Sequence, residues 1–404
     1  AAYQDYLAVG ELSLSGATRP IRGALAIAML ARTMKKRGVI LPAANASEAA
    51  AVPGIDIIPI HSLKDAVAFC NNTSSVKPFS HKGSDSIFKK KPPAVDFNEV
   101  KGQSHAKRAL EIAAAGNHNI LLCGPPGSGK TMLAKALSGI MPDLTSQEAL
   151  DATKIHSIAG ILSHGQHLIT QRPFRSPHHT ISYAGLIGGG TTPRPGEVSL
   201  AHNGILFLDE LPEFSRQALE VLRQPLEDGY VTISRARSTL TFPTQFLFIA
   251  AMNPCPCGFQ GHPHKRCTDT EMQIQRYRGK ISGPLLDRID MHLEVPALQY
   301  RDFSKEDNDI EPSAKVQQRV MGARRIQYQR YNAEETNATV PFNKMKPFCQ
   351  LSPECSEVMR HALDVMGVSA RAHNKLLRVA RTIADLAQSP DVQYDHLMET
   401  LHFR

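Results

Sequence analysis

A glycine-rich loop of eight residues constrains this chain more than any other feature of its sequence. Residues 124–131 read Gly-Pro-Pro-Gly-Ser-Gly-Lys-Thr, after the apolar run 119–123 and before the helical pattern 132–137. Glycines allow backbone N–H groups to turn inward around phosphate groups, and a helix N-terminus adds positive potential at the same point. Because strand, loop and helix follow in the required order, the sequence favours a nucleotide-phosphate site over a chance glycine-rich turn.

This loop supplies the candidate phosphate ligands and one candidate metal ligand. Lys130 is expected to reach the β- and γ-phosphates of ATP, and the hydroxyl of Thr131 is expected to bind Mg²⁺. The predicted nucleotide-binding residues are Gly124, Pro125, Pro126, Gly127, Ser128, Gly129, Lys130 and Thr131.

Two further apolar runs end in polar side chains. Asp209 and Glu210 follow the run 205–208, at the kind of strand end where ligands bind in parallel sheets. Asp209 is expected to hold Mg²⁺ through water, and Glu210 to polarise the attacking water. An acidic strand end without a role is the alternative, which the upstream phosphate loop disfavours. Asn253 ends a third run and would orient the lytic water, although Asn before proline is also common in turns.

Length and composition are those of a large globular chain. The 404 residues allow two or three domains, and 42% hydrophobic with 21% charged residues is typical of soluble proteins. The seven scattered cysteines favour a reducing cytoplasm over a disulfide framework. No apolar run is long enough to cross a bilayer. A net charge of +8 is compatible with a polyanionic partner, but equally with a solvated basic surface.

Changes in composition divide the chain into four predicted parts. Residues 1–75 alternate short apolar runs with helical patterns, which predicts an α/β domain with a helix at 25–32 and strands at 38–42 and 55–60. Residues 76–95 are polar, basic and proline-bearing, as linkers are. Residues 96–300 hold the phosphate loop, and residues 301–404 predict a helical domain with helices at 355–366 and 371–388. Because the chain starts with Ala1 rather than Met, we expect the natural protein to begin earlier, with part of its first domain missing.

Five longer motifs carry a resemblance to a known family. They read RPFRSPHH at 172–179, GEVSLAHNG at 196–204, RQPLEDG at 223–229, NPCPCG at 253–258 and ISGPLLDRID at 281–290. Together with the phosphate loop they resemble the magnesium-chelatase branch of the AAA+ ATPases over residues 96–404, and within it the ComM/YifB family. The resemblance implies an α/β fold, with a P-loop three-layer αβα core and a C-terminal helical lid.

The same resemblance implies cofactors and partners. ATP and Mg²⁺ would be bound by a homo-oligomer, a hexameric ring in the bacterial cytoplasm without membrane association. The ring would move on single-stranded or branched DNA, acting in branch migration during natural transformation.

The resemblance also implies roles for two arginines and gives Asn253 the first sensor position. Arg288 matches the arginine finger, which would reach the γ-phosphate of a neighbouring subunit and therefore requires an oligomer. Its alternative is a salt bridge to Asp287 or Asp290. Arg371 matches the second sensor. A cation in the first turn of a helix is unfavourable against the helix dipole, which favours a role at phosphate over a plain surface position.

The first domain resembles the second half of a Lon-type protease domain, through the segments 10–16 and 19–25. Where that protease has a catalytic lysine, this chain has Leu25, which cannot activate a serine. We therefore expect a scaffold or partner surface without peptidase activity.

A predicted β-hairpin is the first candidate for contact with DNA. Residues 229–242 consist of two β-rich runs around a basic tip, where Arg235 and Arg237 would pair with phosphates in the pore of the ring. The resemblance implies that this hairpin projects toward the pore. An exposed loop that merely tolerates basic residues is the alternative.

The segment 172–190 is the second candidate for contact with DNA. Its glycine-rich end at 186–190 is expected to form a flexible tip that grips and releases the strand, with the same alternative as the hairpin. Neither segment carries interleaved aromatic residues, so contact with the DNA backbone is favoured over base reading. The basic residues of this segment are Arg172, Arg175, His178 and His179.

A cluster of cysteines and histidines suggests a metal site. Cys255, Cys257, His262, His264 and Cys267 lie in one short Gly/Pro-rich loop, as the ligands of small zinc sites do. Only one residue separates the first two cysteines, where zinc sites usually have two, and cysteine is often simply buried. Zinc binding and a plain buried cluster therefore both remain open.

Three functions remain to be weighed. The first is a DNA-translocating helicase or branch migrator, the second a chelatase subunit that uses ATP to insert Mg²⁺ into a porphyrin, and the third an ATP-driven protein unfoldase. The protease-like domain and the basic hairpin disfavour the chelatase, and the lack of an aromatic pore loop disfavours the unfoldase. We therefore expect an ATPase coupled to movement on DNA.

Overall fold

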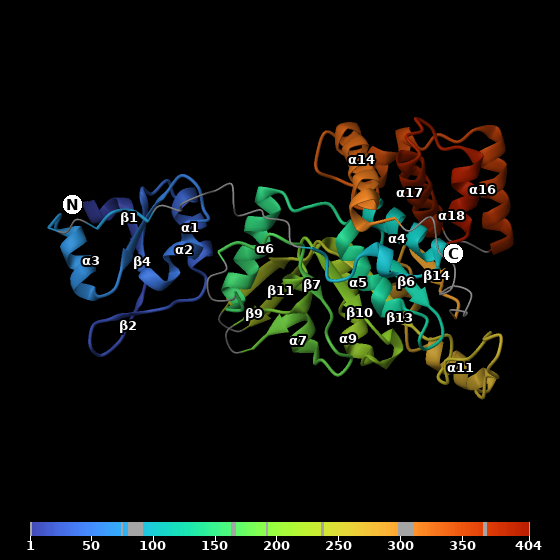
Figure 1. Ribbon diagram of the computed structural model, residues 1–404, viewed down its shortest axis with the longest axis horizontal. Helices are drawn as coiled ribbons and strands as arrows, with labels where there is room; N and C mark the ends of the chain where they lie inside the picture. Colours follow the sequence, from blue (N-terminus) through green and yellow to red (C-terminus); the bar gives the residue numbers. More distant parts are fainter. Residues whose placement is uncertain are drawn as a thin grey trace.

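The computed structural model describes residues 2–73, 76–79, 92–162, 167–190, 193–235, 238–297, 311–366 and 370–403. These residues form an N-terminal α/β unit, a central unit built on a five-stranded sheet, and a C-terminal group of helices (Figure 1). Of the predicted linker 76–95, residues 80–91 lie outside the described part of the chain.

The N-terminal unit is a small parallel sheet flanked by short helices. Its main strands follow the order β1-β4-β5, and the strands predicted at 38–42 and 55–60 are confirmed. The helix predicted at 25–32 is α1, whose buried Leu25 packs in one apolar cluster with Val39 and Ile57 of the sheet. The elements are β1 (Tyr6–Ala8), β2 (Glu11–Leu12), β3 (Thr18–Arg19), α1 (Ala24–Thr33), β4 (Gly38–Pro42), α2 (Ala46–Ala49), β5 (Asp56–Ile60) and α3 (Leu63–Cys70).

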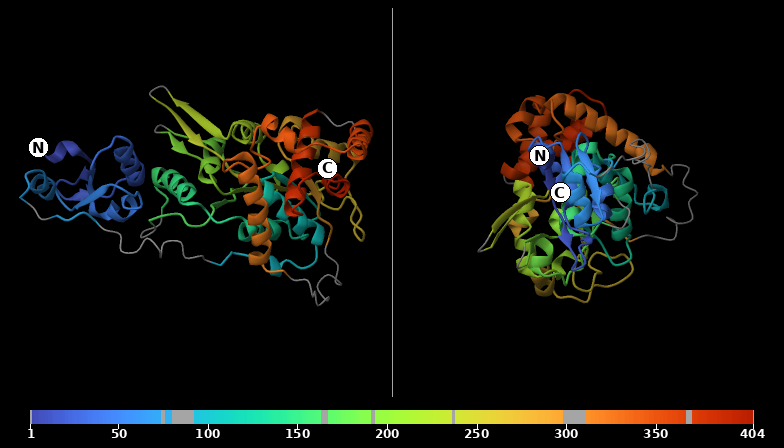
Figure 2. Two further views of the ribbon diagram at one scale, coloured as in Figure 1. Left: turned by 90° about the horizontal axis from the view of Figure 1, so that it is seen from above. Right: turned by 90° about the vertical axis from the view of Figure 1, so that its left-hand side faces the viewer.

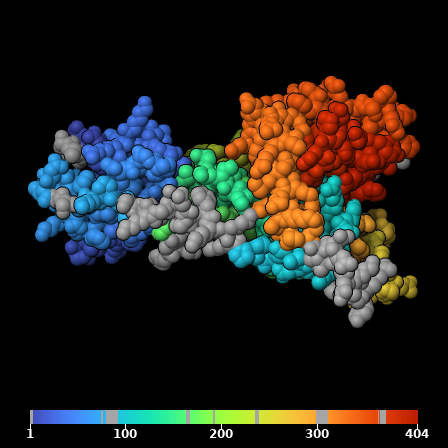
Figure 3. Space-filling model, turned by 45° about the horizontal axis from the view of Figure 1, so that its top comes forward, coloured from blue at the N-terminus to red at the C-terminus, as the bar shows by residue number. Residues whose placement is uncertain are grey.

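Helix α6 (Ser146–Ala159) joins the N-terminal unit to the central unit. Leu150 of α6 belongs to the apolar cluster of the N-terminal unit, and the Ser157 hydroxyl donates a hydrogen bond to the Glu48 carboxylate. Figure 3 shows the N-terminal unit, in blue, as a lobe at one end of the molecule. Its packing on the rest of the protein therefore depends strongly on one face of α6.

Five parallel strands form the central sheet, in the order β14-β6-β13-β10-β7. The strands are short and mostly buried, as expected where both faces of a parallel sheet are covered. In the register, Ile120 of β6 lies opposite Met291 on one side and Ile249 on the other. The strands are β6 (Ile120–Cys123), β7 (Phe174–Arg175), β10 (Ile205–Leu208), β13 (Leu247–Met252) and β14 (Met291–Glu294).

Successive residues of these strands face two different layers of helices. Ile120 and Leu122 belong to one core cluster with α4 (Ser104–Gly116) and α5 (Lys130–Ile140), whereas Leu121 belongs to a second cluster on the opposite face. The predicted α/β fold with a P-loop three-layer core is thereby confirmed. The remaining elements are α7 (Tyr183–Ile187), β8 (Gly188–Gly189), β9 (Arg194–Pro195), α8 (Glu197–Leu200), α9 (Arg216–Glu220), α10 (Arg223–Asp228), α11 (Glu271–Arg278) and α12 (Gly283–Leu286).

The predicted hairpin is present and projects from the body of the central unit (Figure 2). It consists of β11 (Tyr230–Arg235) and β12 (Ser238–Pro243), paired in antiparallel register up to Arg235 opposite Ser238. Val231 and Phe242 anchor its base in the second core cluster. The hairpin therefore has a base that is fixed in the core and an end that projects from the protein.

The C-terminal helices pack on the first helical layer of the sheet. Val316 of α14 and Val379 of α17 share the core cluster of β6 and α4. The helices predicted at 355–366 and 371–388 are confirmed as α16 and α17, and the Ser352 hydroxyl accepts a hydrogen bond from the Cys355 backbone N–H at 3.2 Å. The elements are α14 (Ser313–Tyr331), α15 (Phe342–Met345), α16 (Pro353–Met366), α17 (Ala370–Leu386) and α18 (Tyr394–Leu401). In the described ranges, no helix combines the length and the apolar character needed to cross a membrane.

A buried ionic network holds α14 and α17 together. The Asp385 carboxylate accepts hydrogen bonds from Arg381 of the same helix and from Arg330 of α14. Arg381 is fully buried and also donates to the backbone carbonyls of Pro390 at 2.8 Å and Ser389 at 2.6 Å. Both guanidinium groups therefore depend on one buried carboxylate for charge compensation.

We expect Asp385→Ala to lower the free energy of unfolding by about 3–5 kcal/mol, because it leaves two arginines without their buried counter-charge. Asp364→Ala is the matched control, since that carboxylate pairs with Arg360 on an exposed face of α16 and its loss should change stability little. Chemical denaturation of both variants measures the difference. Equal stabilities would contradict the role of the network.

Candidate active site

The phosphate loop joins β6 to α5, as predicted, and its backbone requires glycine at two positions. Gly127 and Gly129 have φ angles of 77° and 84°, in the left-handed region that side chains disfavour. Gly129 immediately precedes the first turn of α5, so the free N–H groups of that helix open toward the loop. The loop is thus shaped to receive an anion.

Lys130 lies inside this loop and is 8% exposed. Its Nζ donates to the backbone carbonyls of Gly124 at 2.7 Å and Pro125 at 3.0 Å, and to Oδ1 of Asn253 at 3.3 Å. Burial lowers the pKa of Lys130, and the nearby charge of Asp209 opposes that shift. The predicted first sensor therefore contacts the predicted phosphate-binding lysine directly.

The two predicted Mg²⁺ ligands lie next to each other. The Thr131 hydroxyl donates to Oδ2 of Asp209 at 2.7 Å, and Oδ1 of Asp209 accepts from the Glu210 backbone N–H at 3.0 Å. A hydroxyl and a carboxylate in this arrangement are oxygen ligands of the kind that Mg²⁺ uses beside nucleotide phosphates. Glu210 itself has a φ of 53°, a left-handed conformation that is costly for a residue with a side chain. The strained turn directs Glu210 away from the path of the strand.

His179, which was predicted to contact DNA, lies beside Glu210 in the structure. Its Nδ1 is 3.3 Å from Oε2 of Glu210, and its ring lies 4.0 Å from the ring of His178. The cause is strand order. Since β7 pairs in parallel with β10, with Arg175 opposite Leu206, the residues that follow β7 lie level with those that follow β10.

Arg172 and Arg175 were predicted to contact DNA, and in the structure both are paired with carboxylates of their own chain. The Arg172 guanidinium pairs with both carboxylate oxygens of Glu148, at 2.9 and 3.1 Å, and its side chain is 8% exposed. Arg175 makes a bidentate pair with Glu197, at 2.6 and 2.7 Å, and this interaction raises its pKa. Both arginines therefore bind internal carboxylates and hold the segment against α6 and α8.

The prediction of a flexible tip at 186–190 is wrong for its first two residues. Leu186 and Ile187 are 0% and 5% exposed and belong to the second core cluster. The backbone carbonyl of Arg194 lies so close to Gly188 that a Cβ there would be 2.3 Å from it. Glycine at 188 thus allows close packing of β8 on β9 rather than mobility.

Arg235 ends β11, at the far end of the hairpin from its buried base. Its side chain and the whole of Arg237 lie outside the described residues. Their contact with DNA stays a prediction.

Arg288 and Arg371 line one cleft of about 450 Å³ together with Glu227. Arg288 pairs with the Glu227 carboxylate and lowers its pKa, instead of pairing with Asp287 or Asp290. The cleft also contains Asn119, which immediately precedes β6 and whose side chain donates to the Arg288 carbonyl at 3.0 Å. Both arginines therefore lie at the amino edge of the sheet, whereas the phosphate loop lies at the carboxyl edge, about 13 Å away for a four-residue strand.

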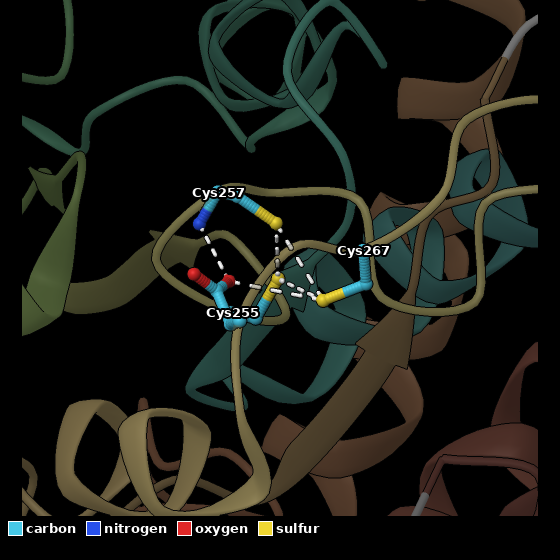
Figure 4. Close-up of side chains that lie close together, drawn as sticks. Cys255, Cys257 and Cys267 are labelled. Carbon is cyan, nitrogen blue, oxygen red and sulfur yellow. Dashed lines mark hydrogen bonds between the residues drawn. The ribbon is translucent and has the colours of Figure 1, made fainter.

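Three of the predicted metal ligands lie together, and the two histidines do not join them. The Sγ atoms of Cys255, Cys257 and Cys267 are 3.4 to 3.6 Å apart (Figure 4). Asp269 completes the group, with its ligand atom within 4.8 Å of the three sulfurs. His262 instead accepts backbone N–H groups of His264 and Lys265 at its Nδ1. Sequence reasoning missed Asp269, because carboxylates are far commoner than cysteines and carry no comparable signal.

Comparison with known proteins now places the chain. It matches the family models described as magnesium chelatase, subunit ChlI, over residues 96–303, and its C-terminal counterpart over residues 310–404. Residues 1–45 match the model described as subunit ChlI of Mg-chelatase. It is 42% identical to the uncharacterized protein YifB of Escherichia coli over 99% of this chain and 77% of that protein. Identity is also 42% to the competence protein ComM of Haemophilus influenzae, over 98% of this chain and 77% of that protein.

The chain belongs to the ComM/YifB family. Its central unit is accordingly an AAA+ ATPase core of the magnesium-chelatase type, and ATP with Mg²⁺ is the expected cofactor pair of this family. A weaker match, 29% over 34% of the chain, is to the Holliday junction branch migration complex subunit RuvB of Bdellovibrio bacteriovorus.

The geometry at Glu210 leads to a test of catalysis. Glu210→Gln should lower the ATPase rate by about 10²–10⁴-fold, because an amide cannot serve as general base, and should leave ATP binding intact. Lys130→Ala should lose ATP binding. Steady-state ATPase assays with a fluorescent nucleotide-binding assay separate the two effects.

Glu213→Gln is the matched control, because this exposed carboxylate lies three residues further on and pairs with Lys280. It should keep the rate of the unaltered protein. His179→Ala should lower the rate less than Glu210→Gln does, since it removes only a neighbour of the carboxylate. An active Glu210→Gln variant would exclude Glu210 as the base.

Proposed function

We propose that this chain is the motor subunit of a homo-oligomeric ring that hydrolyses ATP to move on DNA. The process we propose is branch migration during the integration of DNA taken up in natural transformation, supported by the competence protein ComM and the branch migration subunit RuvB among its relatives. The separation of Arg288 and Arg371 from the phosphate loop of the same chain is the observation that carries the proposal. We propose that the ring has six subunits and that it acts in the bacterial cytoplasm.

Within one subunit, each polar residue at the carboxyl edge of the sheet has a proposed role. Lys130 neutralises the β- and γ-phosphates, and Thr131 with Asp209 holds Mg²⁺. Glu210 activates the attacking water, and Asn253 orients that water against the γ-phosphate. The direct hydrogen bonds from Thr131 to Asp209 and from Lys130 to Asn253 support the assignment of these four residues to one site.

The two arginines complete the site of a neighbouring subunit. Arg288 approaches the γ-phosphate as the arginine finger, and Arg371 serves as the second sensor from the same cleft. Glu227 holds Arg288 by an ion pair within a subunit, and a γ-phosphate from the neighbour would compete for the same guanidinium. Because neither arginine lies at the phosphate loop of its own chain, hydrolysis requires assembly.

The hairpin β11–β12 is the proposed DNA contact. It projects from the central unit, and in the sequence Arg235 and Arg237 fall between its two strands or at their ends, where we propose that they bind phosphates of the DNA backbone. Sequence-independent contacts of this kind suit a motor that must pass over any sequence. Since Arg172 and Arg175 are bound by internal carboxylates, the hairpin is the favoured site.

A subunit of a magnesium chelatase is the second candidate, favoured by the family models that match the chain. The ATPase site would be the same, but the partner would be a porphyrin-binding subunit rather than DNA. An ATP-dependent protein unfoldase is a third candidate, for which the described structure offers no specific support. Stimulation of the ATPase by DNA discriminates among the three.

A mixing experiment tests the shared site. Glu210→Gln subunits retain intact arginines, and Arg288→Ala subunits retain an intact phosphate loop, so each variant alone should be inactive. Mixed before assembly, they should regain ATPase activity, because some interfaces combine an intact loop with an intact arginine. The same result is expected with Arg371→Ala. Mixtures as inactive as their components would place these arginines in the site of their own chain.

A DNA-coupling experiment tests the hairpin. Single-stranded DNA should stimulate the ATPase of the unaltered protein, and Arg235→Ala with Arg237→Ala should return the rate to its basal level. The salt dependence of binding should fall by about 1.4 in log–log slope, since each single-stranded phosphate contact contributes about 0.7.

Arg325→Ala with Arg360→Ala is the matched control, because it removes two exposed arginines from the C-terminal helices and leaves the hairpin unchanged. It should retain stimulation by DNA. If DNA neither binds the unaltered protein nor stimulates it, the DNA-motor proposal fails and the chelatase function is preferred.

A further inference from the structure

The loop between β13 and α11 brings together three thiol groups and one carboxylate. The sulfur atoms form a triangle with sides of 3.4, 3.5 and 3.6 Å, and Oδ2 of Asp269 lies 3.8 Å from Sγ of Cys267. In a tetrahedral zinc site with Zn–S bonds of about 2.3 Å, adjacent sulfurs are about 3.8 Å apart. The four side chains thus already lie close to the spacing that one zinc ion imposes.

A disulfide and an iron–sulfur cluster both fit this geometry less well than zinc does. A disulfide needs sulfur atoms about 2.05 Å apart, and any pairing among three cysteines leaves one thiol over. An iron–sulfur cluster spreads its thiolates over separate iron atoms, whereas these sulfurs converge on one point. Soft thiolate ligands in a tetrahedral set favour zinc over hard cations such as Mg²⁺.

Backbone groups support the proposed ligands. The N–H of Cys257 donates to Oδ2 of Asp269 at 2.8 Å, and the N–H of Gln260 donates to Sγ of Cys255 at 3.3 Å. Such hydrogen bonds orient metal ligands and spread their negative charge. Lys265 and Arg266 belong to the same loop, and Arg278 of α11 contacts it at Pro254 and Gln260.

This loop also forms part of the wall of the nucleotide site. It begins at Asn253, two residues before Cys255, and Gly258 packs so closely on Pro126 of the phosphate loop that a Cβ would lie 2.6 Å from Cδ of that proline. Arg278 donates to the Pro254 carbonyl at 3.1 Å and to the Gln260 side chain at 2.9 Å. A cleft of about 610 Å³ lies between Gln260 and the start of the phosphate loop.

We propose that Cys255, Cys257, Cys267 and Asp269 bind one structural zinc ion, and that the zinc-bound loop holds Asn253 and Pro126 in place at the nucleotide site. The 17 residues between Asn253 and Glu271 (residues 254–270) contain no helix or strand. Zinc therefore supplies the order that this wall cannot obtain from secondary structure. The ion takes no part in hydrolysis.

Metal analysis of the purified full chain tests the first half of the proposal. We expect about one zinc ion per chain, retained in His262→Ala with His264→Ala and in Cys70→Ser, a cysteine of the N-terminal unit. Cys267→Ser and Asp269→Ala should lose most of the zinc, and Asp269→Cys should retain it. Less than about a tenth of an equivalent in the unaltered protein, or full zinc in Cys267→Ser, would overturn the site.

Cobalt substitution of the unaltered chain gives a measurement that does not depend on ATPase activity. Co²⁺ bound to the unaltered chain should show thiolate-to-metal charge-transfer absorption and the intense visible bands of tetrahedral coordination. Asp269→Cys should strengthen the charge-transfer bands by adding a fourth thiolate. Weak bands typical of an octahedral oxygen site would exclude the proposed ligand set.

Nucleotide binding tests the second half. Asp269→Ala should weaken the binding of a fluorescent ATP analogue by about tenfold or more, as loss of a supporting shell does elsewhere, while Cys70→Ser should not. Unchanged affinity in a zinc-depleted variant would overturn the role of the loop. Because neither assay contains DNA, their failure is distinguishable from failure of the proposed motor function.

Discussion

The parallel direction of the strands beside β6 is the constraint on which the rest of this structure depends. Since β14, β6, β13, β10 and β7 all run the same way, residues that follow the strands gather at one edge and residues that precede them gather at the other. Lys130, Asp209 and Asn253 consequently lie at the carboxyl edge, where Lys130 donates a hydrogen bond to Asn253 and Thr131 donates one to Asp209. Arg288 and Arg371 lie at the amino edge, so a site that uses them together with the phosphate loop would have to combine two subunits, as we propose.

Much of the candidate ATPase site could be predicted because each of its parts lies in a short, recognisable segment of sequence. The phosphate loop, the acidic end of β10 and the polar end of β13 each follow an apolar run, and the resemblance to AAA+ proteins gave their order. The position of His179 could not be obtained in this way. It depends on β7 lying beside β10, a pairing between segments about 30 residues apart that no local pattern encodes.

The internal pairing of two arginines that were predicted to contact DNA has a related cause. A basic residue in sequence looks the same whether it meets a phosphate or a carboxylate of its own chain, and the partners of Arg172 and Arg175 are 24 and 22 residues away. Desolvation favours the internal ion pairs, because a buried guanidinium requires a nearby counter-charge. Asp269 was overlooked for the opposite reason, since only folding brings one ordinary carboxylate to three cysteines.

Strand β13 connects the hairpin, Asn253 of the nucleotide site and the cysteine-bearing loop. Its amino end continues from the hairpin β11–β12, and its carboxyl end leads through Asn253 into the loop with Cys255 and Cys257. All six residues of β13 are buried between β6 and β10, so the strand moves as part of the sheet and not by itself. A force on the hairpin from DNA would therefore reach Asn253 through a stiff element. A zinc-bound loop beyond Asn253 would oppose displacement at that end, which directs the strain toward the contact between Asn253 and Lys130.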